Sequence, residues 1–302
     1  MKRPFRLATL IAIAFAATAP LLLDGDATAQ KQAVTSVDLE LVLAVDISRS
    51  MDEDEHTLQR DGYVSAFRHT DVINALTGGP EGRIAVTYME WANDARQVIP
   101  WTIIDSAKAA HDFADRLAAE PIYGERRTSI TRALYEAERL IRENGIDSHR
   151  QVIDVSGDGA NNTGGSVEEA RDFVLKRKIN INGLPILLHT NGQGGYGGGY
   201  NPWGIDIPNL DRYYKHCVIG GDGAFIAPVF DLKQLSATIR KKLVLEIAHL
   251  EIEPGVAPVQ YADARELPVP GIERAQLKLP TEKSDCFAGE KARAAREGGN
   301  FP

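Results

Sequence analysis

The chain has 302 residues, 43% of them hydrophobic and 25% charged, and a formal net charge of −8. This length and apolar content are enough for one sizeable core, and the acidic balance disfavours nucleic acid and anionic membrane surfaces as partners. No basic run and no alternation of basic with aromatic residues argues for a nucleic-acid-binding protein.

The first segment of the chain has the pattern of a secretory signal peptide. Basic residues precede an apolar stretch over residues 7–23, and residues 27–29 (Ala-Thr-Ala) offer the small-x-small pattern that signal peptidase recognises. We expect cleavage after Ala29, which removes residues 1–29, leaves a net charge of −9 and makes the mature protein periplasmic or secreted. An uncleaved membrane anchor is the alternative, but the apolar stretch contains Pro20. No later stretch reaches the roughly 18 apolar residues of a membrane span.

The first predicted strand of the mature chain leads into a loop rich in oxygen ligands. An apolar run ends in Asp46-Ile47-Ser48-Arg49-Ser50. In an extended or turning segment, residues i, i+2 and i+4 point the same way, so this loop can aim a carboxylate and two hydroxyls at one point. Mg²⁺ prefers such oxygen ligands. By itself the motif is equally typical of a turn that ends in a helix N-cap at Ser50 or Asp52.

Strand-like and helical patterns alternate through most of the chain. Strands are predicted over residues 39–45, 83–91, 151–155 and 179–188, and helices over residues 53–67, 106–119, 130–143, 166–177 and 232–248. This alternation predicts an α/β fold with a doubly wound, mostly parallel sheet flanked by helices. Most of the strands are continuous apolar runs, as strands buried on both faces require.

Two further polar loops lie where ligands are expected in such a sheet. Thr128 opens a helical pattern, and the strand that begins at Gln151 ends in Ser156-Gly157-Asp158-Gly159. Ligands of open parallel sheets bind beyond the carboxyl ends of the strands, where loops from neighbouring strands converge. Asp154 is a competing carboxylate, but it is expected inside the strand. The fold and the ligand chemistry therefore predict a metal site at the same edge of the sheet.

These three loops resemble the metal-ion-dependent adhesion site of the von Willebrand factor A (VWA) domain. That site combines Asp-x-Ser-x-Ser, a threonine from a second loop and an aspartate from a Thr-Asp-Gly loop. The resemblance assigns these roles to Asp46, Ser48, Ser50, Thr128 and Asp158. It covers Val37 to His249, within a predicted domain over residues 36–249. Two departures are Arg126 and Arg127, where the family often has glycine, and Ser-Gly-Asp-Gly in place of Thr-Asp-Gly.

The chain is most similar to uncharacterised exported bacterial proteins of the VWA superfamily. They share the Asp-x-Ser-x-Ser start, a Val-Ser-Gly-Asp-Gly segment like residues 155–159 and a late segment like residues 218–225. For that group the resemblance implies a fold and a metal site, and no established activity.

The resemblance implies a binding module rather than an enzyme. The five site residues are expected to hold Mg²⁺, or alternatively Mn²⁺ or Ca²⁺, and to leave one coordination position for an Asp or Glu side chain of a partner protein. A haloacid-dehalogenase-type phosphatase would need a second aspartate where Ser48 stands. A metal-dependent hydrolase would need a general base, and the strand-associated candidates, His189 and Glu90, are interpreted as structural. A scaffold with a vestigial metal site is the remaining alternative.

A glycine-rich insertion over residues 191–204 and two cysteines remain without an assigned role. The insertion lacks the Lys-Ser/Thr of a phosphate-binding loop, so it is either a recognition loop near the metal or a flexible surface excursion. An exported protein can form a disulfide between Cys217 and Cys286, which would tether the C-terminal tail. Cys217 could equally be a small buried hydrophobic residue.

The last predicted helix and the C-terminal tail complete the chain. The helix has an apolar face, and Arg240, Lys241 and Lys242 are expected to form a solvated flank beside it. The tail, over residues 250–302, is rich in Pro, Ala, Glu and Arg and is expected to lack a core. Within it, residues 251–279 are expected to add an edge strand or wrap the domain, and residues 290–302 to be disordered.

Overall fold

The computed structural model of the chain describes residues 35–187, 207, 209–248, 273–274 and 283–299. The expected signal peptide and the glycine-rich insertion lie outside these residues. The strands are β1 (Ser36–Val37), β2 (Glu40–Asp46), β3 (Ile84–Trp91), β4 (Ala95–Ile104), β5 (Asp147–Ser148), β6 (Gln151–Gly157), β7 (Asn180–Pro185), β8 (Phe225–Ile226) and β9 (Glu273–Arg274). The helices are α1 (Glu53–Phe67), α2 (Thr70–Thr77), α3 (Ala107–Ala119), α4 (Ile130–Glu143), α5 (Val167–Leu175), α6 (Leu210–Tyr213), the π-helical turn η1 (Tyr214–Val218), α7 (Leu232–Ala248) and α9 (Ala288–Arg296).

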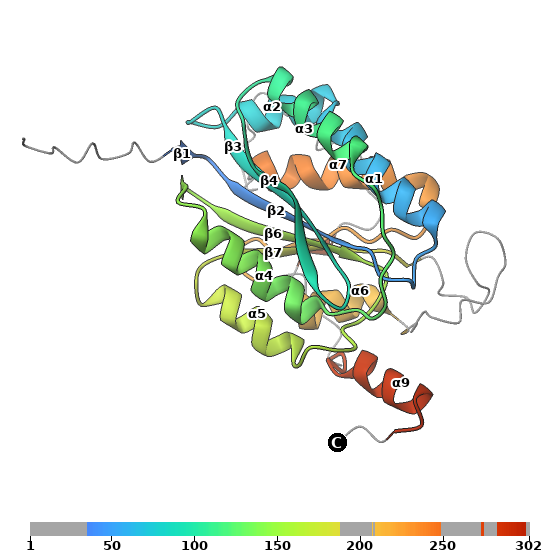
Figure 1. Cartoon of the computed structure of the whole chain (residues 1–302). Coiled ribbons are helices and arrows are strands. Elements are labelled where there is room, and N and C mark those ends of the chain that lie inside the picture. The colour runs from blue at the N-terminus through green and yellow to red at the C-terminus, as the bar shows by residue number, and fades with distance from the viewer. Residues whose placement is uncertain (1–34, 188–206, 208, 249–272, 275–282, 300–302) are drawn as a thin grey trace, which may run out of the picture. The chain divides into compact units, whose positions relative to one another are not determined.

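A central sheet carries helices on both faces (Figure 1). Its strand order is β4-β3-β2-β6-β7-β8-β9, and neighbouring strands are parallel except for β4 and β9, which lie antiparallel at the two edges. The short strands β1 and β5 form a separate parallel pair. This architecture confirms the predicted α/β class with a doubly wound, mostly parallel sheet, and the fold is VWA-like.

The central strand β2 is buried along its whole length because both of its faces pack against helices. Leu41 and Leu43 belong to the apolar cluster that includes residues of α1, α2, α3 and α7. Val42 and Ala44, which point to the opposite face, belong to the cluster that includes α4 and α5. The same split is visible in Figure 1, where α1, α2, α3 and α7 lie on one side of the sheet and α4 and α5 on the other.

The helices that follow the polar loops begin at capping residues other than the candidate metal ligands. Asp52 caps α1 in a reciprocal capping box with Glu55, and the Ser129 hydroxyl caps α4. The sequence was consistent with an N-cap at either Ser50 or Asp52, and the structure shows that Asp52 is the N-cap. The hydroxyls of Ser50 and Thr128 are not consumed by capping.

The elements that were not predicted from the sequence include the strand β4 and the helix α2. The edge strand β4 contains Pro100 and mixes exposed with buried positions, so it lacks the continuous apolar run of the inner strands. The two-turn helix α2 is too short for a clear helical period, and only Val72, Ala75 and Leu76 are buried on it. Neither element changes the order of the parallel strands that carry the polar loops.

The expected solvated flank of α7 is wrong at Lys242, whose side chain is 1% exposed. Its ammonium lies 2.5 Å from Asp154 Oδ1 and pairs with Glu246 Oε1 one helical turn away. Asn182 donates a further hydrogen bond of 2.9 Å to Glu246. Asp154, which is inside β6 as expected, therefore serves the packing of α7 on the sheet. Two carboxyl groups and one ammonium form this buried charge cluster.

Because the buried charge cluster has more carboxyl groups than cations, folding should depend on pH. Burial, and secondarily the charge of Asp154, raises the pKa of Glu246 from 4.5 to about 7. The folded state thus holds this proton more tightly than the unfolded state. The resulting stabilisation is complete below pH 4.5 and is lost as the pH rises through about 7.

A Glu246→Gln variant tests this pH dependence. Glutamine mimics the protonated carboxyl at every pH. We therefore expect the free energy of unfolding of wild type to fall, relative to that of the variant, by on the order of 3 kcal/mol between pH 5 and pH 8. Urea titrations followed by circular dichroism at both pH values measure the difference. Glu169→Gln, at an exposed position of α5, is the matched control. A constant difference between Glu246→Gln and wild type would contradict the prediction.

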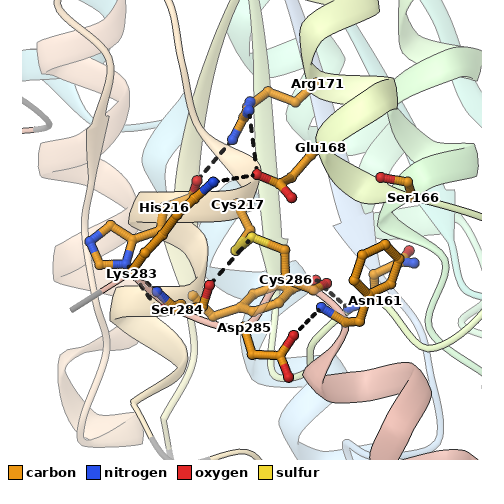
Figure 2. Close-up of a disulfide and its surroundings, with 12 residues drawn as sticks. Asn161, Ser166, Glu168, Arg171, His216, Cys217, Lys283, Ser284, Asp285 and Cys286 are labelled. Atoms are coloured by element: carbon orange, nitrogen blue, oxygen red, sulfur yellow. Dashed lines mark hydrogen bonds and ion pairs between the residues drawn. A yellow bond between two sulfur atoms is a disulfide. The ribbon is translucent and has the colours of Figure 1, made fainter. Parts of the chain in front are cut away.

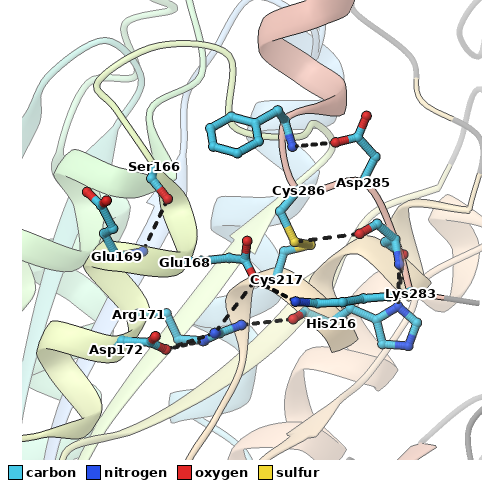
Figure 3. Close-up of polar contacts among 12 residues, drawn as sticks. Ser166, Glu168, Glu169, Arg171, Asp172, His216, Cys217, Lys283, Asp285 and Cys286 are labelled. Carbon is cyan, nitrogen blue, oxygen red and sulfur yellow. Dashed lines mark hydrogen bonds and ion pairs between the residues drawn. A yellow bond between two sulfur atoms is a disulfide. The ribbon is translucent and has the colours of Figure 1, made fainter.

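The C-terminal tail contains an ordered helix that was not expected. Helix α9 occupies residues that were predicted to be disordered, and Cys217 and Cys286 form a disulfide that joins it to η1 (Figure 2). Next to the bridge, the Ser284 N–H donates to Nδ1 of His216, and Lys283 pairs with Glu168 of α5 (Figure 3). The prediction failed because a charged, alanine-rich helix has little core of its own and depends on the covalent bond and these polar contacts. The expected edge strand is present as β9.

Candidate metal site

The register of two central strands brings two of the predicted ligand loops together. Strands β2 and β6 are parallel neighbours, and Val45 pairs with Ser156, so Asp46 ends its strand beside Gly157. The chain leaves β2 and β6 towards opposite faces of the sheet, to α1 and α5, and ligands of open parallel sheets bind at such points. Asp46 and Asp158 lie at these strand ends.

A continuous series of short polar contacts links the first and third loops. The Ser48 N–H donates to Asp46 Oδ1 at 2.7 Å, and the hydroxyls of Ser48 and Ser50 are 2.6 Å apart. The Ser50 hydroxyl in turn donates to Asp158 Oδ1 at 2.5 Å. All four side chains are buried. The replacement of Thr-Asp-Gly by Ser-Gly-Asp-Gly therefore leaves Asp158 next to the serine hydroxyls.

Thr128 joins the site through the backbone of the third loop. Its N–H donates to the side-chain carbonyl of Asn162 at 3.0 Å, and the Asn162 N–H donates back to the Thr128 carbonyl at 2.8 Å. A Cβ built on Gly159 would lie 3.6 Å from the Thr128 hydroxyl oxygen, so the threonine side chain faces the loop that carries Asp158. Asn162 thus fixes the second loop against the third, a role that sequence reasoning missed.

The Asp46 carboxylate is the most constrained group of the site. It is fully buried, and its Oδ2 has no hydrogen-bond partner among the described residues. Burial raises its pKa to about 7, and hydrogen bonds from Ser48 and from the Asp158 backbone oppose that rise. These hydrogen bonds compensate an ionised carboxylate only in part, because a buried charge needs a partner of opposite charge or hydrogen bonds to every lone pair. A divalent cation would supply that compensation.

The donor set fits a hard cation better than a zinc-type site. In the described part of the chain, no three His, Cys, Asp or Glu side chains gather as a metal-binding group, so any ion at this edge depends on hydroxyls as well as carboxylates. Two carboxylates with serine and threonine hydroxyls are oxygen ligands of the kind that Mg²⁺, Mn²⁺ and Ca²⁺ accept. The residues present therefore fit the group that the sequence predicts.

Buried side chains around the loops hold their backbone in place. His56 Nε2 lies 3.0 Å from the Ser48 carbonyl oxygen, and burial lowers the pKa of this histidine. Gln59 donates to the Ser156 hydroxyl at 3.0 Å. Glu90, interpreted as structural from the sequence, pairs with Arg60 and, at 2.9 Å, with Arg96. The other strand-associated candidate, His189, lies outside the described residues.

The C-terminal helix contacts the same loops. Asn161 donates to Glu290 of α9 at 2.6 Å, and a Cβ on Gly289 would collide with the Asn161 carbonyl, which shows how closely α9 approaches. Tyr214 of η1 is also adjacent, because a Cβ on Gly157 would lie 3.0 Å from its hydroxyl. These neighbours could not be predicted from the sequence, since all of them depend on contacts between distant segments.

Several solved structures are similar to this chain. They include proximal thread matrix protein 1 of the mussel byssus, solved with a zinc-occupied MIDAS motif (13% identity, TM-score 0.47, 71% of this chain and 49% of that chain). BatB from Bacteroides thetaiotaomicron (18%, 0.42, 70% and 99%) and the pilus adhesin SpaC from Lactobacillus rhamnosus GG (11%, 0.47, 72% and 31%) are also similar. The chain thus spans about half of the mussel protein and about a third of the adhesin.

Sequence comparisons assign the chain to a family. No curated protein sequence matches it. A family model described as "Protein of unknown function (DUF1194)" matches residues 36–251, which is most of the chain. In the structure, none of the described helices is long and apolar enough to cross a membrane. Because the family model covers most of it, the chain belongs to the DUF1194 family.

Proposed function

We propose that this protein is an exported, metal-dependent protein-binding module. The observation that carries the proposal is the buried Asp46 carboxylate, whose Oδ2 lacks a hydrogen-bond partner in the described part of the chain. It lies where the hydroxyls of Ser48 and Ser50 meet the carboxylate of Asp158. A site of this composition, at the carboxyl end of a parallel sheet, suits a divalent cation.

Asp46, Ser48, Ser50, Thr128 and Asp158 would hold Mg²⁺, with Mn²⁺ or Ca²⁺ as alternatives. A bound ion would provide an electrophilic centre that accepts an Asp or Glu side chain of a partner protein. The chain's own residues keep that centre electrophilic, because two carboxylates balance the divalent charge only formally and serine and threonine hydroxyls donate weakly. The buried supports at His56, Gln59 and Asn162 keep the ligand loops in position before a partner arrives.

The side chains around the candidate metal site favour binding of a partner over catalysis. The position two residues after Asp46, where a phosphatase of the haloacid-dehalogenase type needs an acid, is Ser48. Glu90 is engaged by two arginines, and His56 is held against a backbone carbonyl. A general base needs to reach the proton that it abstracts. These groups are therefore better suited to supporting the loops than to catalysis.

Calorimetric titration of the chelator-treated mature protein with Mg²⁺ and Mn²⁺ tests the proposal. We expect saturable binding that is lost, by about a hundredfold or more in affinity, in Asp46→Ala, because the variant removes one of two carboxylates. A phosphatase assay with a generic aryl phosphate should show no turnover. Export is tested by the mass of the protein recovered from the periplasmic fraction, which should begin at Gln30. Absence of metal binding by the wild-type protein would exclude the proposed function and leave a scaffold.

A further inference from the structure

We infer that an arginine-lined pocket beside the metal loops binds further carboxylates of the partner, so that the recognised element is an acidic segment rather than one acidic residue. The inference rests on the proposed function, which identifies the partner as a protein. It adds a second anion site, built from side chains that the metal site does not use.

The pocket has a volume of about 440 Å³ and is lined by Arg49, Asn93, Gly124, Glu125, Arg126 and Arg127. Its position relative to the candidate metal ligands follows from the sequence. Arg49 stands between Ser48 and Ser50, and Arg127 immediately precedes Thr128. Since these arginines and the ligands occupy the same two loops, a partner that reaches the metal site also reaches the pocket.

Backbone hydrogen bonds fix the two walls of the pocket to each other. The Arg49 N–H donates to the Glu125 carbonyl at 2.7 Å, and the Glu125 N–H donates to the Ile47 carbonyl at 2.9 Å. The Arg49 side chain also donates from Nε to the Gly124 carbonyl at 3.3 Å, which leaves the outer nitrogens of its guanidinium for other acceptors. The pocket is therefore a prearranged feature of the loops.

The backbone of Arg127 is strained, which marks its side chain as a candidate functional group. Its φ is +72°, in the left-handed region, which strains a residue that has a Cβ and does not strain glycine. Strained residues of this kind cluster at functional sites. An arginine at a position that glycine would occupy without strain points to a use for the guanidinium.

The charge and composition of the pocket match a carboxylate-bearing protein segment. Three arginines and one glutamate line it, which gives a local positive charge on a chain whose net charge is −8. Guanidinium groups bind carboxylates in a bidentate fashion. Tyr123, the residue before the pocket loop, is 58% exposed. Arginine and tyrosine are among the residues that protein interfaces concentrate at their energetic centres, whereas the net negative charge of the chain disfavours nucleic acid as the partner.

A carboxylate of the chain itself already lies at the edge of the pocket. Glu297, at the end of α9, has its Oε1 3.8 Å from Arg127 Nη2, and both side chains are about half exposed. An exposed pair at this separation contributes little to stability, so a partner carboxylate can take its place. The pair shows within the chain the kind of contact, between an arginine and a carboxylate, that we infer for the partner.

The test uses a fluorescein-labelled hexaglutamate peptide and a matched peptide with one glutamate among five serines. Six extended residues span about 20 Å, enough to bridge adjacent sites. Anisotropy titrations compare the wild-type mature protein with Arg49→Gln/Arg126→Gln, each in Mg²⁺ and in EDTA. The control, Lys108→Gln/Lys176→Gln, makes the same charge change on exposed side chains of α3 and α5 at the opposite end of the sheet.

We expect the double arginine variant to bind hexaglutamate at least tenfold more weakly than wild type in Mg²⁺, and to bind the single-glutamate peptide and Mg²⁺ itself with little change. The lysine control should match wild type. Equal hexaglutamate affinity in the arginine variant and wild type, or no binding of hexaglutamate by wild type, would overturn the inference. A tenfold arginine effect that persists in EDTA, with no Mg²⁺ binding by calorimetry, would retain the pocket and reject the metal-dependent function.

Discussion

Replacing Lys242 by methionine is expected to lower the free energy of unfolding by about 3–5 kcal/mol at pH 7.5. Among the residues that the structure describes, Lys242 supplies the one ammonium that pairs with both Asp154 and Glu246, and its side chain is 1% exposed. Methionine preserves most of the volume, so the loss of stability reflects two buried carboxyl groups left without a counter-ion. Urea unfolding followed by circular dichroism measures it.

The same experiment at pH 5 separates this electrostatic cause from a packing defect. Burial raises the pKa values of both carboxyl groups, that of Glu246 to about 7, so acid neutralises them and the deficit of the variant should shrink. Lys241→Met, at a half-buried position next along α7, is the matched control and should change stability by no more than about 0.5 kcal/mol. Equal unfolding curves for the two variants would show that the buried charge cluster does not stabilise the fold.

The positions of the inner strands and the placement of the polar loops at one edge of the sheet could be predicted from the sequence because both follow from local patterns. Continuous apolar runs identified β2, β3, β6 and β7, and helical periodicity gave the exact limits of α1, α4 and α7. Once the strands are parallel, their carboxyl ends lie at the same edge of the sheet, which predicts that Asp46 and the Asp158 loop lie at that edge. The pairing of β2 with β6, which makes the two loops neighbours, is known only from the structure.

Features that depend on contacts between distant segments could not be predicted in this way. Lys242 follows the spacing of a solvated helix flank, and only the packing of α7 over Asp154 explains its burial. The tail helix α9 has the composition of a disordered segment, and its order depends on the disulfide to Cys217 and on Asn161. The left-handed backbone of Arg127 likewise could not be predicted from the sequence, because nothing in the local pattern of residues marks it.

Two glycines on either side of Asp158 allow the metal site to be tested separately from the rest of the fold. A Cβ on Gly157 would lie 2.7 Å from Asp46 Oδ2 and 3.0 Å from the Tyr214 hydroxyl, closer than side-chain carbons are tolerated in a buried site. A Cβ on Gly159 would lie 3.5 Å from Thr128 Cγ2, which is an ordinary contact. Neither glycine adopts a left-handed backbone, so neither alanine substitution strains the backbone. The two substitutions therefore differ in the atoms that the added methyl group contacts.

Gly157→Ala is therefore expected to displace the Asp46 carboxylate, to lower the affinity for Mg²⁺ at least about tenfold and to reduce the free energy of unfolding by about 1–3 kcal/mol. Gly159→Ala should leave both quantities within about 0.5 kcal/mol of wild type. Calorimetry with Mg²⁺ and urea unfolding of both variants provide the comparison. Loss of stability in Gly157→Ala with unchanged Mg²⁺ affinity would mean that Asp46 Oδ2 takes no part in holding a metal, because the methyl group moves that oxygen first.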